Sequence, residues 1–143
     1  MSRYMRWIYA GWFATIAVAI VVQFYLAGYA VFGFHGLNDF GPHLVVGDLI
    51  GIAILLGIGL AFAARVPWRL TIINIALFVL MFVQAVLAHT GVQVISALHV
   101  VNGILILGGT VNLAREAISW ARLQGSARPA AAAATPVQEL AAR

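Results

Sequence analysis

The sequence predicts an all-α protein, a four-helix transmembrane bundle with up-down-up-down topology, and three observations support this fold class. Hydrophobic residues make up 64% of the 143 residues and charged residues only 8%, unlike the composition of a soluble domain. Four apolar runs each reach the about 20 residues that a helix needs to cross a hydrocarbon core. The chain has arginines and no lysine. The arginines lie before the first run, between the second and third, and after the fourth, but not in the other two connections.

The four predicted helices span about residues 7–32, 43–64, 70–89 and 92–114. Their connections are short, so neighbouring helices run antiparallel. Together they form one membrane domain over residues 1–122. Residues 123–143 are rich in alanine and contain two prolines and few large apolar residues. We expect this last segment to be a disordered cytoplasmic tail, because it lacks the apolar surface that a packed core needs.

The arginines predict how the bundle is oriented. They precede the first run, separate the second from the third, and follow the fourth: Arg3, Arg6, Arg65, Arg69, Arg115, Arg122, Arg128 and Arg143. The positive-inside rule therefore places both termini in the cytoplasm. We expect a multi-pass protein of the bacterial inner membrane, with the lipid bilayer as its main partner and a quinol or another redox partner as a further candidate. The arginines form no continuous basic stripe, so nucleic-acid binding is not predicted.

An internal repeat relates the two halves of the chain. "VVQFYLAG" (21–28) and "FVQAVLAH" (82–89) share the pattern x-V-Q-x-x-L-A-x, and in each half the next helix carries a histidine followed by a glycine at i+4. The sequence thus predicts two pseudo-repeated helical hairpins about an axis along the membrane normal. Gln23 and Gln84 fall inside spans, where each amide either bonds a neighbouring helix or lines a cofactor pocket.

The four histidines all fall on the side of the membrane opposite the arginines. Ionisable residues inside a membrane are expensive and mark functional sites, and neutral imidazole is an axial ligand for haem iron. His43 and His99 occupy corresponding places in the two repeats. The sequence therefore predicts a b-type haem (haem b) with His43 and His99 as axial ligands of the iron. It predicts electron transfer or haem handling near the outer face.

Three glycines support this site. Residues at i and i+4 share one helix face, so Gly47 and Gly51 follow His43 down its helix and Gly103 follows His99. Their missing side chains would leave a slot for the flat macrocycle. The same glycines also suit close packing of helices, and this reading stays open.

Other ligand arrangements also stay open. His43 begins its helix whereas His99 lies deeper in its own, and His89 is closer in depth to His43, so His43 and His89 form an alternative pair. His35 lies in the first outer loop and is a weaker candidate. Several of the four histidines together would suit a looser zinc or copper site.

Asp48 is the only acid inside a span. It either hydrogen-bonds across the bundle to Asn102, Asn74 or a glutamine, or carries protons or tunes a nearby cofactor. The chain has no cysteine, which excludes disulfides and iron–sulfur clusters. No catalytic residue is assigned, because Ser96 near His99 has no matching acid or oxyanion site. A cofactor-free membrane subunit and a small transporter or metal-handling protein are the alternative functions.

Four segments carry a resemblance to known proteins: "VVQFYLAGYAVFG", "HLVVGDLIGIAILL", "VQAVLAH" and "SALHVVNGILIL". Across about residues 10–115 the chain resembles a family of small, uncharacterised four-helix bacterial membrane proteins. More distantly, its layout resembles one four-helix half of haem A synthase, which holds a histidine pair on the second and fourth helices.

The second resemblance implies haem binding by His43 and His99, with His35 or His89 beside the propionates. The haem A synthase pattern has a glutamate in the first outer loop and an arginine after the first histidine. Here the loop has Asp39 and the next residue is Leu44. Oxidation of a haem methyl group is therefore not implied.

Overall fold

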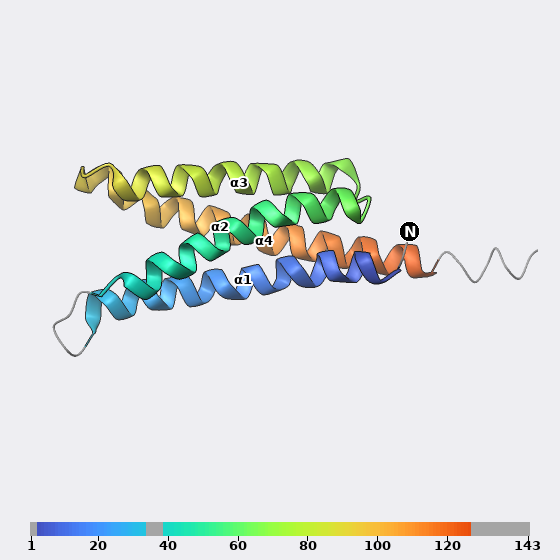
Figure 1. Ribbon diagram of the computed structural model, residues 1–143, viewed down its shortest axis with the longest axis horizontal. Coiled ribbons are helices and arrows are strands. Elements are labelled where there is room, and N and C mark those ends of the chain that lie inside the picture. Colours follow the sequence, from blue (N-terminus) through green and yellow to red (C-terminus); the bar gives the residue numbers. More distant parts are fainter. Residues whose placement is uncertain (1–2, 34–38, 127–143) are drawn as a thin grey trace, which may run out of the picture.

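The computed structural model describes residues 3–33 and 39–126 and confirms the predicted fold class. Its helices are α1 (Arg3–Phe32), α2 (Gly41–Ala63), α3 (Trp68–His89) and α4 (Gln93–Ser126), and the described residues contain no strand. They form an elongated antiparallel bundle (Figure 1). Each helix contains a candidate membrane span of 22 to 31 residues with a mean hydropathy between 1.9 and 2.5. All four are therefore long and apolar enough to cross a membrane.

Apolar side chains cover the outside of the bundle. Val18, Phe62 and Phe82 are more than 60% exposed, and no more than 22% of the residues in any spanning window are buried inside the protein. In water this surface would be strongly unfavourable, whereas in a bilayer it faces acyl chains. The pattern of exposure thus agrees with a multi-pass membrane protein.

The two hairpins are arranged so that α2 and α4 occupy opposite corners. Helix α1 packs against α2 and α4, and α3 packs against the same two helices, but α2 and α4 make no close backbone approach. Figure 1 shows α2 crossing the bundle obliquely, beside α1 where it begins and toward α3 where it ends. Side chains from α2 and α4 can therefore meet only through the middle of the bundle.

The two ends of the bundle differ in charge. The described arginines lie where α1 begins, where α2 joins α3, and on the last part of α4 (Figure 1). We call this the arginine end, and the opposite end, with the described histidines, the histidine end. Arg69 donates to Glu116 at 2.8 Å at the arginine end, and the Arg6 guanidinium lies 5.8 Å from the Trp120 ring. All described arginines thus lie at the same end of the bundle.

Helix α4 differs from its predicted extent, because it continues beyond residue 114 to Ser126. Ala117 and Ala121 are buried, and Ile118 packs against the core. The apolar residues of this segment thus follow the helical spacing of three or four residues. Residues 123–126 of the predicted tail are helical, and residues 127–143 lie outside the described residues.

The connection between α2 and α3 is a tight cap at the arginine end. Arg65 adopts a left-handed conformation with φ of 47°. The Arg65 amide donates to the Phe62 carbonyl, the Val66 amide donates to the Ala61 carbonyl, and Pro67 follows. This bond pattern is a Schellman motif, in which glycine is the usual left-handed residue. The cap turns the chain sharply, so α3 runs antiparallel to α2.

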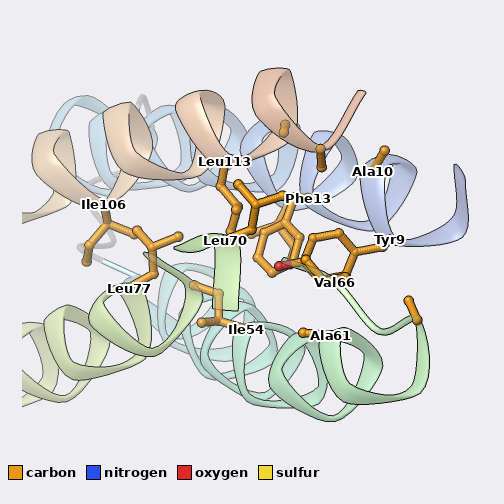
Figure 2. Close-up of a cluster of buried hydrophobic side chains, with 14 of the residues drawn as sticks. Tyr9, Ala10, Phe13, Ile54, Ala61, Val66, Leu70, Leu77, Ile106 and Leu113 are labelled. Carbon is orange, nitrogen blue, oxygen red and sulfur yellow. The ribbon is translucent and has the colours of Figure 1, made fainter. Parts of the chain in front are cut away.

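The best-packed core lies toward the arginine end, where large side chains fill the space between the helices (Figure 2). Tyr9 and Phe13 of α1 are fully buried, with ring centroids 5.0 Å apart. Gly57 of α2 is required beside them, because a Cβ there would lie 2.6 Å from Phe13 Cζ. The same half also buries the polar side chains of Asn74 and Thr110. This closed core contrasts with the histidine end, where the bundle is hollow.

Candidate functional site

A cavity of about 620 Å³ opens between the four helices at the histidine end. His43 of α2 and His99 of α4 face each other across it, with ring centroids 6.1 Å apart and ring planes at 59°. His43 lies near the start of α2 and His99 further inside α4, yet their rings lie side by side. The structure therefore forms the pair His43 and His99.

Both imidazoles are fixed by backbone carbonyls of the preceding helix. His43 Nδ1 lies 3.1 Å from the Gln23 carbonyl oxygen, and His99 Nδ1 lies 3.2 Å from the Gln84 carbonyl oxygen. A carbonyl oxygen only accepts, so each Nδ1 carries the proton and each Nε2 keeps a free lone pair. Neither Nε2 makes a hydrogen bond to another described residue. This orientation is the one that prepares a histidine to ligate a metal.

The two glutamines tie the helices together at the level of the histidines. Gln23 Nε2 donates to the His43 carbonyl at 2.6 Å. Gln84 Oε1 accepts from Asn102 Nδ2 at 2.7 Å, and the same Nδ2 lies 2.9 Å from the Leu80 carbonyl. The prediction that each amide bonds a neighbouring helix is confirmed. Both glutamines also line the cavity, and their role toward a cofactor stays a prediction.

Two of the three candidate glycines line the cavity, and each lies against a side chain of another helix. A Cβ at Gly47 would lie 2.9 Å from Gln23 Nε2, whereas one at Gly103 would lie 3.2 Å from Phe24 Cζ and 3.4 Å from Gln84 Nε2. Gly51 does not line the cavity. Its missing Cβ would contact Met81 of α3 at 3.6 Å. Gly47 therefore leaves room for the Gln23 amide, and Gly103 for the Phe24 ring of α1.

The remaining sequence candidates lie around the cavity or outside the described residues. His89 is exposed among the lining residues, and its Nδ1 bonds the Ala85 carbonyl of its own helix at 2.8 Å. Asp48 also lines the cavity and is exposed. Asp48 makes no hydrogen bond to another described residue, so its predicted bond across the bundle is not formed there. His35 lies outside the described residues.

The cavity follows the internal repeat almost residue by residue. The repeat relates α1 to α3 by 61 positions and α2 to α4 by 56 positions. Lining residues fall into related pairs, such as His43 with His99 and Gly47 with Gly103. The lining residues without a related partner in the wall are Val31, Asp48 and His89. The site is therefore built from two copies of one arrangement, with polar additions from Asp48 and His89.

The described residues do not form the alternative zinc or copper site. Within residues 3–33 and 39–126, no three His, Asp or Glu side chains come together as a metal-binding group. Zinc takes three or four protein ligands, and two opposed imidazoles do not complete such a set. A haem macrocycle supplies four nitrogens of its own, so two imidazoles suffice for it. The donor set fits haem better than a free metal ion.

Sequence reasoning missed two contributors to the site. Asn102 was considered only as a partner of Asp48, yet it donates to Gln84. Its place three residues after His99 puts it on the face toward α3, and this spacing is a usable signal. Phe40 lines the cavity with its ring edge-on to His43, at 6.1 Å and 82°. No sequence pattern singled out Phe40 from the other aromatic residues nearby.

Comparisons with known proteins give a partial match. The chain resembles a family of unknown function. The profile of this family (DUF6220) matches residues 23–91, a segment that begins at Gln23, contains His43 and Gln84, and ends before His99. No curated protein and no solved structure matches the chain. The similarity to an uncharacterised family agrees with the first resemblance, and none of these comparisons bears on haem A synthase.

Proposed function

We propose that this protein binds one b-type haem between His43 and His99 and transfers electrons within the membrane. The distance between the two rings carries this proposal. A metal–imidazole bond is about 2.0 Å long and an imidazole nitrogen lies about 1.1 Å from its ring centre, so two axial rings have centroids about 6 Å apart. The observed separation is 6.1 Å, and both Nε2 atoms are free to bind.

The protein's own residues would hold the cofactor and set its properties. The Gln23 and Gln84 carbonyls fix the ring orientations and raise the basicity of the imidazoles. Ile50 and Ile106 face the cavity from α2 and α4, and such apolar walls limit water and tune the potential. The haem iron, when bound, supplies one-electron chemistry. A haem-handling protein would use the same pair, so the site supports both roles.

The difference in charge between the two ends suggests how the protein is oriented in the membrane. By the positive-inside rule the arginine end lies in the cytoplasm, here proposed to be that of a bacterial cell. The histidine end then lies in the outer half of the inner membrane. The exposed His89 imidazole at this end is suited to pair with the propionates of the macrocycle. Electrons would therefore enter or leave near the outer face, and the described residues offer no second histidine pair for a relay toward the arginine end.

Absorption spectroscopy of the purified protein tests this proposal. After expression with supplemented haem, we expect a Soret band and one haem per chain by pyridine haemochrome assay. His43→Ala and His99→Ala should each lose the six-coordinate spectrum. Val94→Ala is the matched control, because it changes an exposed side chain at the same end that does not line the cavity, and it should keep the band. Circular dichroism checks that each variant is folded. A colourless folded wild type overturns the proposal and favours a cofactor-free subunit or a transporter.

A further inference from the structure

Asp48 is a carboxylate that the proposed haem site does not use. It lies seven residues after Gly41, the start of α2, and so about 10 Å along the helix axis. Its side chain is exposed, lines the cavity and has no hydrogen-bond partner among the described residues. An unpaired acid at this depth is expensive and marks a site for a ligand or a proton.

Asp48 faces the side of the cavity between α2 and α3. It is the i−3 neighbour of Gly51, whose missing Cβ would contact Met81 of α3 at 3.6 Å. On α3, His89 lies eight residues after Met81 and therefore on the same face. Asp48 and His89 thus lie on one side of the cavity. The repeat-related positions hold Gly28 and Ile104, which do not line it.

The wall contributed by the first hairpin is also short of hydrogen-bond donors. Gln23 lines the cavity, and its Oε1 is buried without a donor. The related Gln84 Oε1 accepts from Asn102, whereas the position related to Asn102 holds Val46. This acceptor is buried even without a ligand, so it marks a difference between the two hairpins and not a contact for an occupant. A ligand that meets Asp48 should offer a hydroxyl or amine hydrogen, because a carboxylate only accepts.

The membrane narrows the class of ligand. A molecule that reaches Asp48 from the side must dissolve in hydrocarbon and be uncharged, because the neighbouring exposed residues Leu44 and Leu49 are apolar. Lipid amines and the hydroxyls of acylglycerols belong to the headgroup region, whereas Asp48 lies about 10 Å along α2 from its first residue. A hydroquinone instead carries its two hydroxyls on a flat ring that dissolves in the bilayer core. It is also a chemical class that gives electrons to a centre of the proposed kind.

We infer that the side of the cavity between α2 and α3 binds a lipid-soluble hydroquinone, with the Asp48 carboxylate accepting the hydrogen bond of one hydroxyl. The choice of a hydroquinone over other hydroxyl compounds rests on the proposed function. The placement of the site rests on Asp48 alone. The two claims therefore fail separately.

Retention of tritiated decylhydroquinone by the protein in anaerobic nanodiscs tests this site. Asp48→Asn keeps the shape and removes the charge, and Asp48→Ile installs the residue of the related position 104. We expect both to weaken binding about tenfold or more, the ratio for one hydrogen bond to a charged group. Asp39→Asn is the matched control, because Asp39 lies at the same end and bonds the Gly41 amide. It should bind as the wild type does.

Four outcomes separate the possibilities. Unchanged binding in both Asp48 variants overturns the site, and displacement of the probe by equal amounts of dioleoylglycerol overturns the choice of a hydroquinone. A wild type with a Soret band that retains no probe overturns this inference and leaves the haem proposal standing. A colourless wild type with retention that depends on Asp48 supports the site and overturns the haem proposal.

Discussion

The two hairpins place their histidines and glutamines in the same arrangement at the histidine end, but they differ in the hydrogen bonds that the glutamine side chains make. In each, a histidine bonds the backbone carbonyl of a glutamine on the preceding helix, and a glycine follows the histidine at i+4 and lines the cavity. In the α3–α4 hairpin, Gln84 Oε1 has a donor in Asn102. In the α1–α2 hairpin, Gln23 Oε1 has none. The two hairpins therefore share the histidine geometry, but in the first hairpin the glutamine acceptor has no donor.

In the core toward the arginine end, related positions of the two hairpins hold side chains of different size. Phe13 is related to Asn74 and Gly57 to Leu113. The first hairpin thus pairs a large residue with glycine, and the second pairs a smaller residue with leucine. All four are buried. The two hairpins therefore differ in side-chain size where the core is closed, while most residues of the cavity wall fall into related pairs.

The largest effect on stability is expected where this size exchange is broken. Gly57→Ala places a Cβ 2.6 Å from Phe13 Cζ, and the Phe13 ring is fully buried. We expect a loss of about 1–3 kcal/mol in the free energy of unfolding, measured by dodecyl sulfate titration in mixed micelles. Gly59→Ala is the control, because nothing lies within 4 Å of that Cβ. Failure of Phe13→Leu to rescue Gly57→Ala would count against the exchange.

A smaller loss should follow from making the second hairpin like the first. Asn102→Val leaves Gln84 Oε1 without its donor and removes the bond to the Leu80 carbonyl. We expect a cost of about 1–2 kcal/mol in the same titration. Asn112→Val removes an exposed asparagine from the same helix and should change stability far less. Equal effects of the two variants would show that the buried amide bonds contribute little.

The smallest effect should come from the reverse change. Val46→Asn gives the first hairpin the donor that the second already has, and Gln23 Oε1 gains a partner. We expect a gain of about 0.6 kcal/mol, the average for a polar pair between membrane helices. Val45→Asn is the matched control, because Val45 is exposed on the outside of α2, and it should give no gain. A loss of stability in Val46→Asn would indicate that the two hairpins are not equivalent at this level.

The sequence predicted those features that depend on local composition. Hydropathy located the four helices, and the arginines marked one end, because both signals lie within single segments. The end of α4 was misjudged because Arg115 interrupts the apolar run, while Ala117 and Ala121 continue the helix outside it. Helix length beyond the hydrocarbon depends on packing against α1, which a hydropathy pattern does not contain.

The candidate site was predictable in its residues and less so in its geometry. The repeat identified His43 and His99, but their depths in α2 and α4 favoured a mismatch. The arrangement of α2 and α4 in the whole bundle, which the sequence pattern does not contain, brings the rings to 6.1 Å. Likewise Gly47 was noticed for its spacing, whereas its role depends on where the Gln23 amide lies.

The Schellman cap at Arg65 is the one stretch of backbone that joins the two halves, and it lies at the end remote from the cavity. Each half therefore supplies a complete helix pair with its own imidazole. A chain cut at this turn would still present two complementary fragments, each the structural counterpart of the other. The architecture thus corresponds to a dimer of helix pairs within a single polypeptide. The covalent link keeps the two pairs in equal number, and it lies too far from the cavity to form part of its wall.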